Sequence, residues 1–320
     1  MTLRPLVSVV TPSLNQAQYI VDTILSVRSQ SYENIEHIVV DGGSTDGTVE
    51  ILAGLEGSSA FRWTSEPDRG MYDAINKGLG LAKGEILAYL NSDDLYPPWA
   101  VERIVDFFAK HPEADLVYGD YIRLDEAGGQ MLLLQPPYNA LYIRRSGFIP
   151  QPTTFWRRAV WEAIGGFDST LHFVGDCDFW IRAGRQFGIA KLDEVLAYDR
   201  IQPVAKRSLS DGALRTELDH VRARYGPDGG KRVPHVATVI WVAVERRLQL
   251  MRFVLAAAAQ QRRSGPWSGI IGGRLVRFRA WPLALAFLPG MSVRFLPRAI
   301  KLDPVANGSE PASGQDSARP

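Results

Sequence analysis

The sequence predicts an α/β protein built on a mostly parallel sheet. Strand-like and helix-like segments alternate four times over the first 110 residues, with short connections between them. The strand-like segment at 86–90 is a short, continuous apolar run, which is typical of a strand covered on both faces. A chain of 320 residues that is 46% hydrophobic can also bury a substantial core. Together these observations predict a doubly wound domain.

The expected elements follow from the apolar spacing. In the first part, strands are expected at 6–10, 35–40, 61–65 and 86–90, and helices at 18–29, from about 45 to 53, at 71–82 and at 99–110. Either Ser44 or Thr45 is expected to cap the second helix. The second part is predicted to be mixed, with strands at 116–118, 131–134 and 189–192 and helices at 160–164 and 178–187. Helices, notably at 236–261, are expected to dominate from residue 216 onward.

Polar side chains follow three of the predicted strands. Thr11-Pro12 follows the first, Asp41 with two glycines follows the second, and Asn91 to Asp94 follow the fourth. The carboxyl ends of parallel strands share one edge of the sheet, so these residues are expected to line one crevice. Asp41 suits a ribose or a base, and Asp93 with Asp94 suits a metal that holds a diphosphate. The sequence thus predicts a nucleotide site with a bound metal.

Other interpretations of these residues remain open at this point. A dinucleotide-binding Gly-x-Gly-x-x-Gly loop should follow the first strand, and this chain has no such loop there and no P-loop. That absence argues against a nucleotide-binding oxidoreductase. Taken singly, Asp41 could belong to an ordinary turn, Asn91 to Asp94 could be a solvated helix cap, and Asp176 and Asp178 could be surface acids.

Three ordered segments resemble the signature blocks of family 2 glycosyltransferases. They are VVDGGSTDGT at 39–48, SEPDRGMYDAINKG at 65–78 and LNSDD at 90–94. The resemblance covers roughly residues 5–200 and is strongest to the branch that serves bacterial O-antigen and exopolysaccharide assembly. It implies the GT-A fold, a Rossmann-like transferase domain, with a nucleotide-sugar donor and inversion at the anomeric carbon.

The resemblance also implies site residues by position. The nucleotide-sugar site would comprise Thr11, Pro12, Asn15, Asp41, Gly43, Asp68, Gly70, Asp73, Asn76, Asn91 and Ser92. Asp93 and Asp94 would bind Mg²⁺ or Mn²⁺, with Asp93 as the main ligand, because oxygen ligands and phosphates select hard cations. Asn91 stands where the family often has an aspartate, which predicts a weaker metal site.

A further block, at 175–180, resembles the segment of the family that carries the general base. Asp176 matches that base, and Asp178 is expected to cap or orient the helix that follows. Gln151, Asp178 and Trp180 are assigned to the acceptor side. Gly175 replaces the usual glutamate, which leaves the base with one fewer acidic neighbour. The Gln-x-x-Arg-Trp signature of processive synthases is missing, so a single transfer is expected.

Charge is unevenly distributed along the chain. Residues 1–230 hold 22 basic and 31 acidic residues, a net charge of −9, whereas residues 231–301 hold 13 basic residues and one acid, a net charge of +12. We therefore expect a catalytic domain at 1–210, with a donor half at about 1–115 and an acceptor half at about 116–210. A helical, basic and aromatic extension is expected at 211–302 and a disordered tail at 303–320.

The extension suits a monotopic protein that lies on an anionic membrane surface. The alternative is a helical subdomain packed on the acidic body. We expect no signal peptide and no membrane span, and the single cysteine, Cys177, fits a reducing compartment. The expected location is cytoplasmic, at the inner face of the plasma membrane, with a lipid-linked glycan as acceptor and no nucleic acid partner. A catalytically weak or dead nucleotide-sugar-binding scaffold is the other functional class considered.

Overall fold

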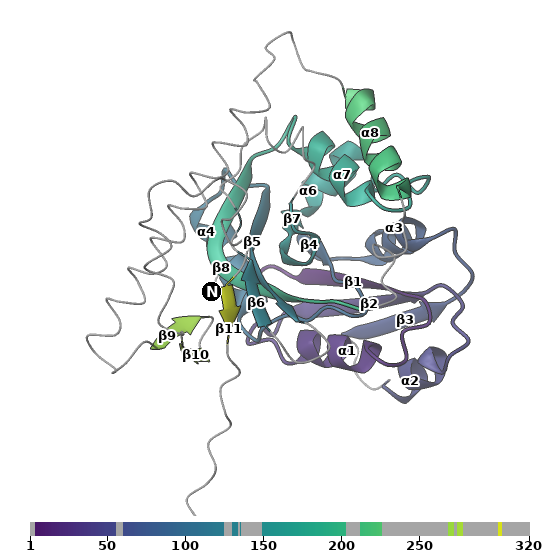
Figure 1. Ribbon diagram of the computed structural model, residues 1–320, viewed down its shortest axis with the longest axis horizontal. Helices are drawn as coiled ribbons and strands as arrows, with labels where there is room; N and C mark the ends of the chain where they lie inside the picture. Colours follow the sequence, from purple (N-terminus) through teal and green to yellow (C-terminus); the bar gives the residue numbers. More distant parts are fainter. Residues whose placement is uncertain are drawn as a thin grey trace, which may run out of the picture.

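The predicted α/β fold is confirmed by the computed structural model, which describes residues 4–55, 60–124, 130–133, 135, 149–202 and 212–225 and the backbone of short strands at 268–271, 274–277 and 300–302. Helices cover both faces of one mixed sheet (Figure 1). The first four strands of this sheet are all parallel.

The donor half alternates strands and helices four times, as the sequence predicts. Its elements are β1 (Val7–Ser13), α1 (Ile20–Arg28), β2 (Ile35–Asp41), α2 (Thr48–Gly54), β3 (Phe61–Ser65), α3 (Met71–Leu81), β4 (Ile86–Tyr89) and α4 (Ala100–Lys110). Their strands lie in the order β3-β2-β1-β4. The chain thus proceeds outward from β1 to β3 and then returns to the other side of β1. The carboxyl ends of β1 and β4 therefore form a topological switch point, where open α/β sheets bind ligands.

The acceptor half adds antiparallel strands to this sheet. It comprises β5 (Leu116–Leu124), β6 (Gln130–Leu133), the 3₁₀ helix η1 (Gln151–Thr153), β7 (Phe155–Arg157), α6 (Arg158–Ile164), α7 (Gly175–Ala183) and β8 (Ile189–Arg200). The sequence did not predict β7, because three residues are too few to show a period. It lies antiparallel to both β4 and β5. β5 and β8 pair in parallel and are both longer than predicted.

Alternate side chains of each strand enter different layers of the core. On β1, Val10 packs in the layer with α3, α6 and α7, whereas Val9 packs in the layer with α4. α1 and α2 close a smaller cluster around Leu52, which also contains Val39 of β2 and Phe61 of β3. Because both faces are covered, β4 is continuously apolar, which is the pattern from which the sequence predicted it.

α8 (Ala213–Tyr225) packs on the acceptor half and shares its core. Val221 is fully buried, and Leu214 and Leu218 pack against the cluster that contains α7. The structural unit therefore continues past residue 210 to the end of α8.

The remainder of the predicted extension is described only at three strands. The helix expected at 236–261 and the tail at 303–320 lie outside the described residues. Within the region expected to be helical, the backbone forms β9 (Ser268–Ile271), β10 (Arg274–Arg277) and β11 (Ile300–Leu302), and β11 pairs with β6. Among the helices that the structure describes, none is both long and apolar enough to cross a membrane.

Candidate active site

The tips of β1, β2 and β4 lie side by side, as the sequence predicts. Ser13 at the end of β1 is the register partner of Asp41 at the end of β2. On the other side of β1, the backbone N–H of Leu90 donates to the carbonyl of Val10 over 2.9 Å. The segments that follow these three strands therefore leave the sheet at one edge, at the switch point.

Asp41 shapes the loop that follows β2. Its carboxylate is fully buried and accepts hydrogen bonds from the backbone N–H groups of Gly43 (3.1 Å) and Ser44 (2.9 Å) and from the hydroxyl of Ser65 (2.7 Å). Gly43 adopts a positive φ of 87°, which glycine tolerates without strain. The carboxylate thus holds a tight turn whose outer surface lies at the switch point.

The loops after β1 and β2 are tied to each other through Asn15. Its backbone N–H donates to the hydroxyl of Ser44 (2.7 Å), and its side-chain oxygen accepts from the N–H of Thr45 (2.9 Å). The predicted capping of α2 by Ser44 or Thr45 is therefore wrong. The helix begins at Thr48 after Gly47, whose φ is 98°, and Oδ1 of Asp46 accepts from the backbone N–H of Thr48 (3.1 Å).

Thr11 and Pro12 are buried at the end of β1. The hydroxyl of Thr11 lies 2.9 Å from Nε2 of His37, inside the sheet. Burial lowers the pKa of His37 to about 3, so this imidazole is neutral. The hydroxyl of Thr11 thus forms its hydrogen bond with His37 inside the core.

The third segment, between β3 and α3, packs against the second. Asp68 accepts a hydrogen bond from the N–H of Gly70 (2.8 Å), and a Cβ on Gly42 would lie only 2.6 Å from its carboxylate. Asp73 pairs with Arg69 over 3.0 Å, and this hydrogen bond lowers the pKa of Asp73. Asp68 and Gly42 therefore approach each other closely because residue 42 has no side chain.

Two other residues of the predicted nucleotide-sugar set have internal positions. The amide of Asn76 donates to the carbonyl of Phe167 (2.7 Å) and accepts from its N–H (2.9 Å). This pair of bonds joins α3 to the loop before α7, so it links the donor half to the acceptor half. Ser92 is buried in the turn that follows β4.

Arg200 lies beside the acidic tip after β4, and its charge lowers the pKa of Asp93 by less than burial raises it. Asp94 is buried and accepts from the N–H of Arg200 (3.2 Å), while Asp93 accepts from the side-chain amide of Gln202 (2.7 Å). Burial raises the pKa of both carboxyls. The negative charge of Asp199 raises both further, and that of Asp93 also raises the pKa of Asp94. A cation at this tip would favour the ionised form of both groups.

The donor atoms at this tip fit a hard divalent cation. Oδ1 of Asn91 is buried without a hydrogen-bond partner, and its amide nitrogen donates to Oε1 of Gln151 (2.9 Å). In the part of the chain that the structure describes, no three His, Cys, Asp or Glu residues are grouped closely enough to hold a metal. Mg²⁺ is commonly bound by one or two carboxylates together with substrate phosphates and water. Asp93, Asp94 and the Asn91 oxygen fit a cation of that kind.

The end of β8 contributes residues to this tip that the sequence did not identify. Leu95 forms a β-bridge with Tyr198, which brings Asp199, Arg200 and Gln202 beside the acidic pair. The apolar run at 195–198, followed by these polar residues, repeats the pattern of a strand with a functional tip. That run is the signal from which they could have been found.

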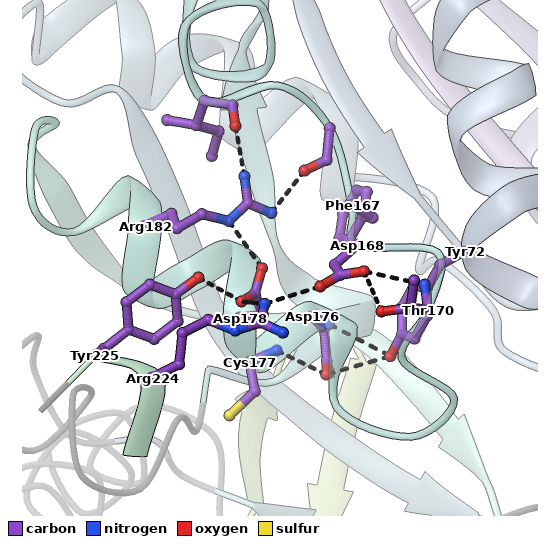
Figure 2. Close-up of polar contacts among 12 residues, drawn as sticks. Tyr72, Phe167, Asp168, Thr170, Asp176, Cys177, Asp178, Arg182, Arg224 and Tyr225 are labelled. Carbon is purple, nitrogen blue, oxygen red and sulfur yellow. Dashed lines mark hydrogen bonds and ion pairs between the residues drawn. The ribbon is translucent and has the colours of Figure 1, made fainter. Parts of the chain in front are cut away.

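Asp176 lies in the first turn of α7, on the acceptor side (Figure 2). Its Oδ1 accepts from the N–H of Cys177 (2.8 Å), and the hydroxyl of Tyr72 lies 3.5 Å from the same oxygen. Cys177 itself is buried, and burial raises the pKa of its thiol well above the usual value. The thiol is therefore protonated, as expected of a packing residue.

Asp178, two residues after Asp176 on α7, is buried and bonded within the fold. Its side chain is 1% exposed and accepts from Nε of Arg182 (2.8 Å) and from the hydroxyl of Tyr225, with Nη1 of Arg224 at 3.4 Å (Figure 2). Tyr225 and Arg224 belong to α8. Asp178 therefore anchors α8 on α7.

The other two residues assigned to the acceptor side differ in position. Trp180 is fully buried among aromatic rings, including that of Trp156 at a centroid distance of 5.7 Å. The amide nitrogen of Gln151 donates to the carbonyl of Tyr89 (2.7 Å), and its oxygen accepts from Asn91. Gln151 thus supports the acidic tip from the acceptor half.

The loop before α7 is held by Glu217 of α8, which the sequence did not single out. Its carboxylate accepts from three consecutive backbone N–H groups, those of His172 (2.7 Å), Phe173 (2.6 Å) and Val174 (3.0 Å). These bonds satisfy donors at the start of α7, which has no cap from its own residues. A contact over 43 to 45 residues has no local sequence signal.

Comparison with known proteins identifies the relatives of this chain. Residues 8–161 match the family model described as Glycosyl transferase family 2. An uncharacterized glycosyltransferase of Mycobacterium tuberculosis (strain ATCC 25618 / H37Rv) is 33% identical over 245 residues, which cover 73% of this chain and 90% of that protein. A PGL/p-HBAD biosynthesis glycosyltransferase of Mycobacterium bovis (strain BCG / Pasteur 1173P2) is 33% identical over 184 residues, covering 56% of this chain and 69% of that protein.

Solved structures with the same fold have lower sequence identity. Staphylococcus aureus TarS 1-349, in complex with UDP-GlcNAc, superposes with a TM-score of 0.55 at 18% identity over 85% of this chain and 96% of that one. This chain spans 58% of the longer TarS chain. The mannosyltransferase PcManGT from Pyrobaculum calidifontis, in complex with GDP-Man and Mn²⁺, superposes with a TM-score of 0.58 at 20% identity. The match covers 82% of this chain and 77% of that one. The chain is therefore a glycosyltransferase of the GT-A fold and belongs to glycosyl transferase family 2.

Proposed function

We propose that this enzyme transfers a single sugar from a UDP-linked donor to a lipid-linked glycan, with inversion at the anomeric carbon, in bacterial surface polysaccharide synthesis. The observation that carries the proposal is the buried acidic pair Asp93 and Asp94 at the switch point, whose carboxyl pKa values are both raised by burial. Structures of the same fold hold UDP-GlcNAc or GDP-Man, whose leaving groups are nucleoside diphosphates. The acidic tip suits such a leaving group when a cation lies between them.

In this proposal the donor lies across the tips of β1, β2 and β4. Asp93 and Asp94, with the oxygen of Asn91, would hold Mg²⁺ or Mn²⁺, and Gln202 keeps the Asp93 carboxylate in place. A cation bound there would supply positive charge to the departing diphosphate. The turn held by Asp41 supplies the surface for the nucleoside.

Asp176 is the proposed general base. It removes the proton from the acceptor hydroxyl while that oxygen bonds to the anomeric carbon. The bond from the anomeric carbon to the diphosphate oxygen breaks in the same step, and the nucleoside diphosphate leaves with the electron pair. Because the hydroxyl attacks the face opposite the leaving group, the configuration inverts.

The proposed location is the inner face of the plasma membrane, with no membrane span. Residues 231–301 carry a net charge of +12, and a basic residue near an anionic surface contributes about 1 kcal/mol. Full-length protein should therefore sediment with vesicles that contain anionic lipid and should remain in solution with purely zwitterionic ones. Equal sedimentation with both would contradict electrostatic attachment.

A nucleotide-sugar-binding scaffold is the second candidate, favoured by the two departures from the family pattern at Asn91 and Gly175. Purified protein mixed with a panel of nucleotide sugars and Mn²⁺ separates the two functions. We expect one donor to raise the melting temperature and to release nucleoside diphosphate slowly by hydrolysis. A raised melting temperature without any release, including with acceptor lipid present, would support the scaffold. If no nucleotide sugar raised the melting temperature and none released nucleoside diphosphate, both the transferase and the scaffold proposals would be contradicted.

A further inference from the structure

Tyr72 places a hydroxyl at the start of the helix that carries Asp176. The residue lies in the first turn of α3, is 2% exposed, and stacks on Phe167 with a centroid distance of 5.8 Å and an interplanar angle of 11°. Its hydroxyl accepts from the backbone N–H of Asp176 (3.3 Å) and lies 3.5 Å from Oδ1 of the same residue (Figure 2). The ring is therefore fixed by packing, and its hydroxyl is directed at one residue.

Gly175 provides the space for this ring. A Cβ at this position would lie 2.6, 2.7 and 2.8 Å from three ring atoms of Tyr72, closer than real Cβ atoms approach their neighbours. Any side chain at 175 would thus displace the tyrosine. Gly175 stands where the family has a glutamate, and the sequence shows only that an acidic side chain is missing. In the structure, the ring of Tyr72 occupies the space that a side chain at 175 would take.

We propose that Tyr72 is a positioning residue for the general base: its hydroxyl holds the Asp176 carboxylate in one orientation and favours the form that accepts a proton. This inference depends on the proposed role of Asp176. A hydrogen bond donated to a carboxylate stabilises the charged form. Burial, followed by the charge of Asp176, raises the pKa of Tyr72 well above its usual value. The phenol therefore remains protonated, and remains a donor, at any pH at which the enzyme works.

Other charged or titratable groups near Asp176 come from three further positions. Among the described residues, Tyr89 on β4 and Cys177 on α7 are affected by the charge of Asp176, Glu217 on α8 acts on Tyr72, and Asp178 and Arg222 act on Cys177. Of these, the thiol and the phenol are protonated at neutral pH, because burial raises their pKa values. Asp178 is neutralised by Arg182. Removal of the Tyr72 hydroxyl, which contacts the Asp176 carboxylate, is therefore expected to change the proton affinity of Asp176.

The test is Tyr72→Phe, which keeps the stacked ring and removes the hydroxyl. We expect kcat to fall about tenfold, the KM for the donor to stay within twofold, and the acid limb of the kcat/KM pH profile to move upward by about half to one pH unit. The matched control is Tyr225→Phe, which removes a hydroxyl from Asp178 on the same helix. Its acid limb is expected to coincide with that of the wild type.

A second variant approaches the same contact from the other side. Gly175→Ala keeps the hydroxyl but displaces the ring, so it should move the acid limb in the same direction. An unmoved acid limb in both folded variants, whatever their rates, would overturn the inference. Asp176→Asn distinguishes the role of Asp176 as the base from the role of Tyr72 in positioning it. If that variant still transfers sugar, the proposed base is wrong, whereas if it is inactive and Tyr72→Phe behaves as wild type, only the role of Tyr72 fails.

Discussion

Two pairs of acids in this molecule differ in how their charge is balanced. Asp178, of the pair on α7, is neutralised by Arg182 of the same helix and lies near Arg224 of α8, so the second contact joins two helices. Among the residues that the structure describes, Asp93 and Asp94 form no ion pair, and the charge of Asp199 is added to theirs. A buried acid with its own cation stabilises the fold, whereas a buried pair without one is suited to hold a cation that arrives with a ligand.

The same contrast separates the two acids within α7. Asp178 is 1% exposed and fully engaged, while Asp176 is partly exposed and contacts the neutral hydroxyl of Tyr72. Two aspartates two residues apart therefore have different expected roles, one in chemistry and one in stability. The variants below separate these roles.

Asp176→Asn should have the largest effect. The amide cannot accept the proton of the acceptor hydroxyl, so the rate of transfer should fall by about 10³-fold or more. Donor affinity, measured by calorimetry in the presence of Mn²⁺, should change less than twofold, because Asp176 lies outside the proposed donor contacts. Activity equal to the wild type would show that another group is the base.

Asp93→Asn should weaken metal-dependent donor binding by about 10- to 100-fold, because it removes a charged ligand of the proposed cation. Titration of donor with and without Mn²⁺ measures this effect. Asp219→Asn, which removes an exposed charge on α8, is the matched control and should bind as the wild type does. Unchanged affinity in Asp93→Asn would place the metal elsewhere.

Asp178→Asn should act on stability. Removing the charge leaves Arg182 without its buried partner, so the free energy of unfolding should fall by about 2 to 4 kcal/mol. Chemical denaturation measures this loss, and transfer per folded molecule should remain within a few-fold of the wild type below the unfolding transition. A rate loss as large as that of Asp176→Asn, in a fully folded variant, would assign Asp178 to the chemistry.

Gln202→Ala should have the smallest effect. Its amide orients Asp93 over 2.7 Å, and loss of one supporting hydrogen bond should weaken Mn²⁺-dependent donor binding by about three- to tenfold. Gln202→Glu supplies the matched comparison, because a third carboxylate at the tip should tighten Mn²⁺ binding relative to the alanine. Wild-type affinity in Gln202→Ala would show that this contact is dispensable.

Much of the donor side could be predicted because short sequence segments show where its strands end. Strand ends at Asp41 and at Asn91 to Asp94 are visible in the sequence, and parallel pairing brings such ends to one edge. The sequence therefore places the acidic residues after β4 at the same edge of the sheet as the structure does. The detailed use of each side chain is not visible in the sequence, since Asp41 binds backbone groups of its own turn and Asn76 binds those of a distant loop.

The contacts that the sequence could not reveal join distant parts of the chain. Gln202 reaches Asp93 because β8 continues past a shift of register beside β5, and no periodic pattern predicts such a shift. Tyr72 meets Gly175 across more than a hundred residues, and a glycine alone does not indicate which ring it accommodates. Tertiary packing, rather than local preference, decides these positions.

The central claim is that the acidic tip after β4 binds its nucleotide-sugar donor through a divalent cation. It is tested most directly by calorimetric titration of the wild-type protein with UDP-GlcNAc and GDP-Man, first with Mn²⁺, then with EDTA, and then with Mn²⁺ restored. We expect one donor to bind at least tenfold more tightly with Mn²⁺ than with EDTA, and the affinity to return when the metal is restored. Equal affinity for that donor with and without the metal would contradict the claim.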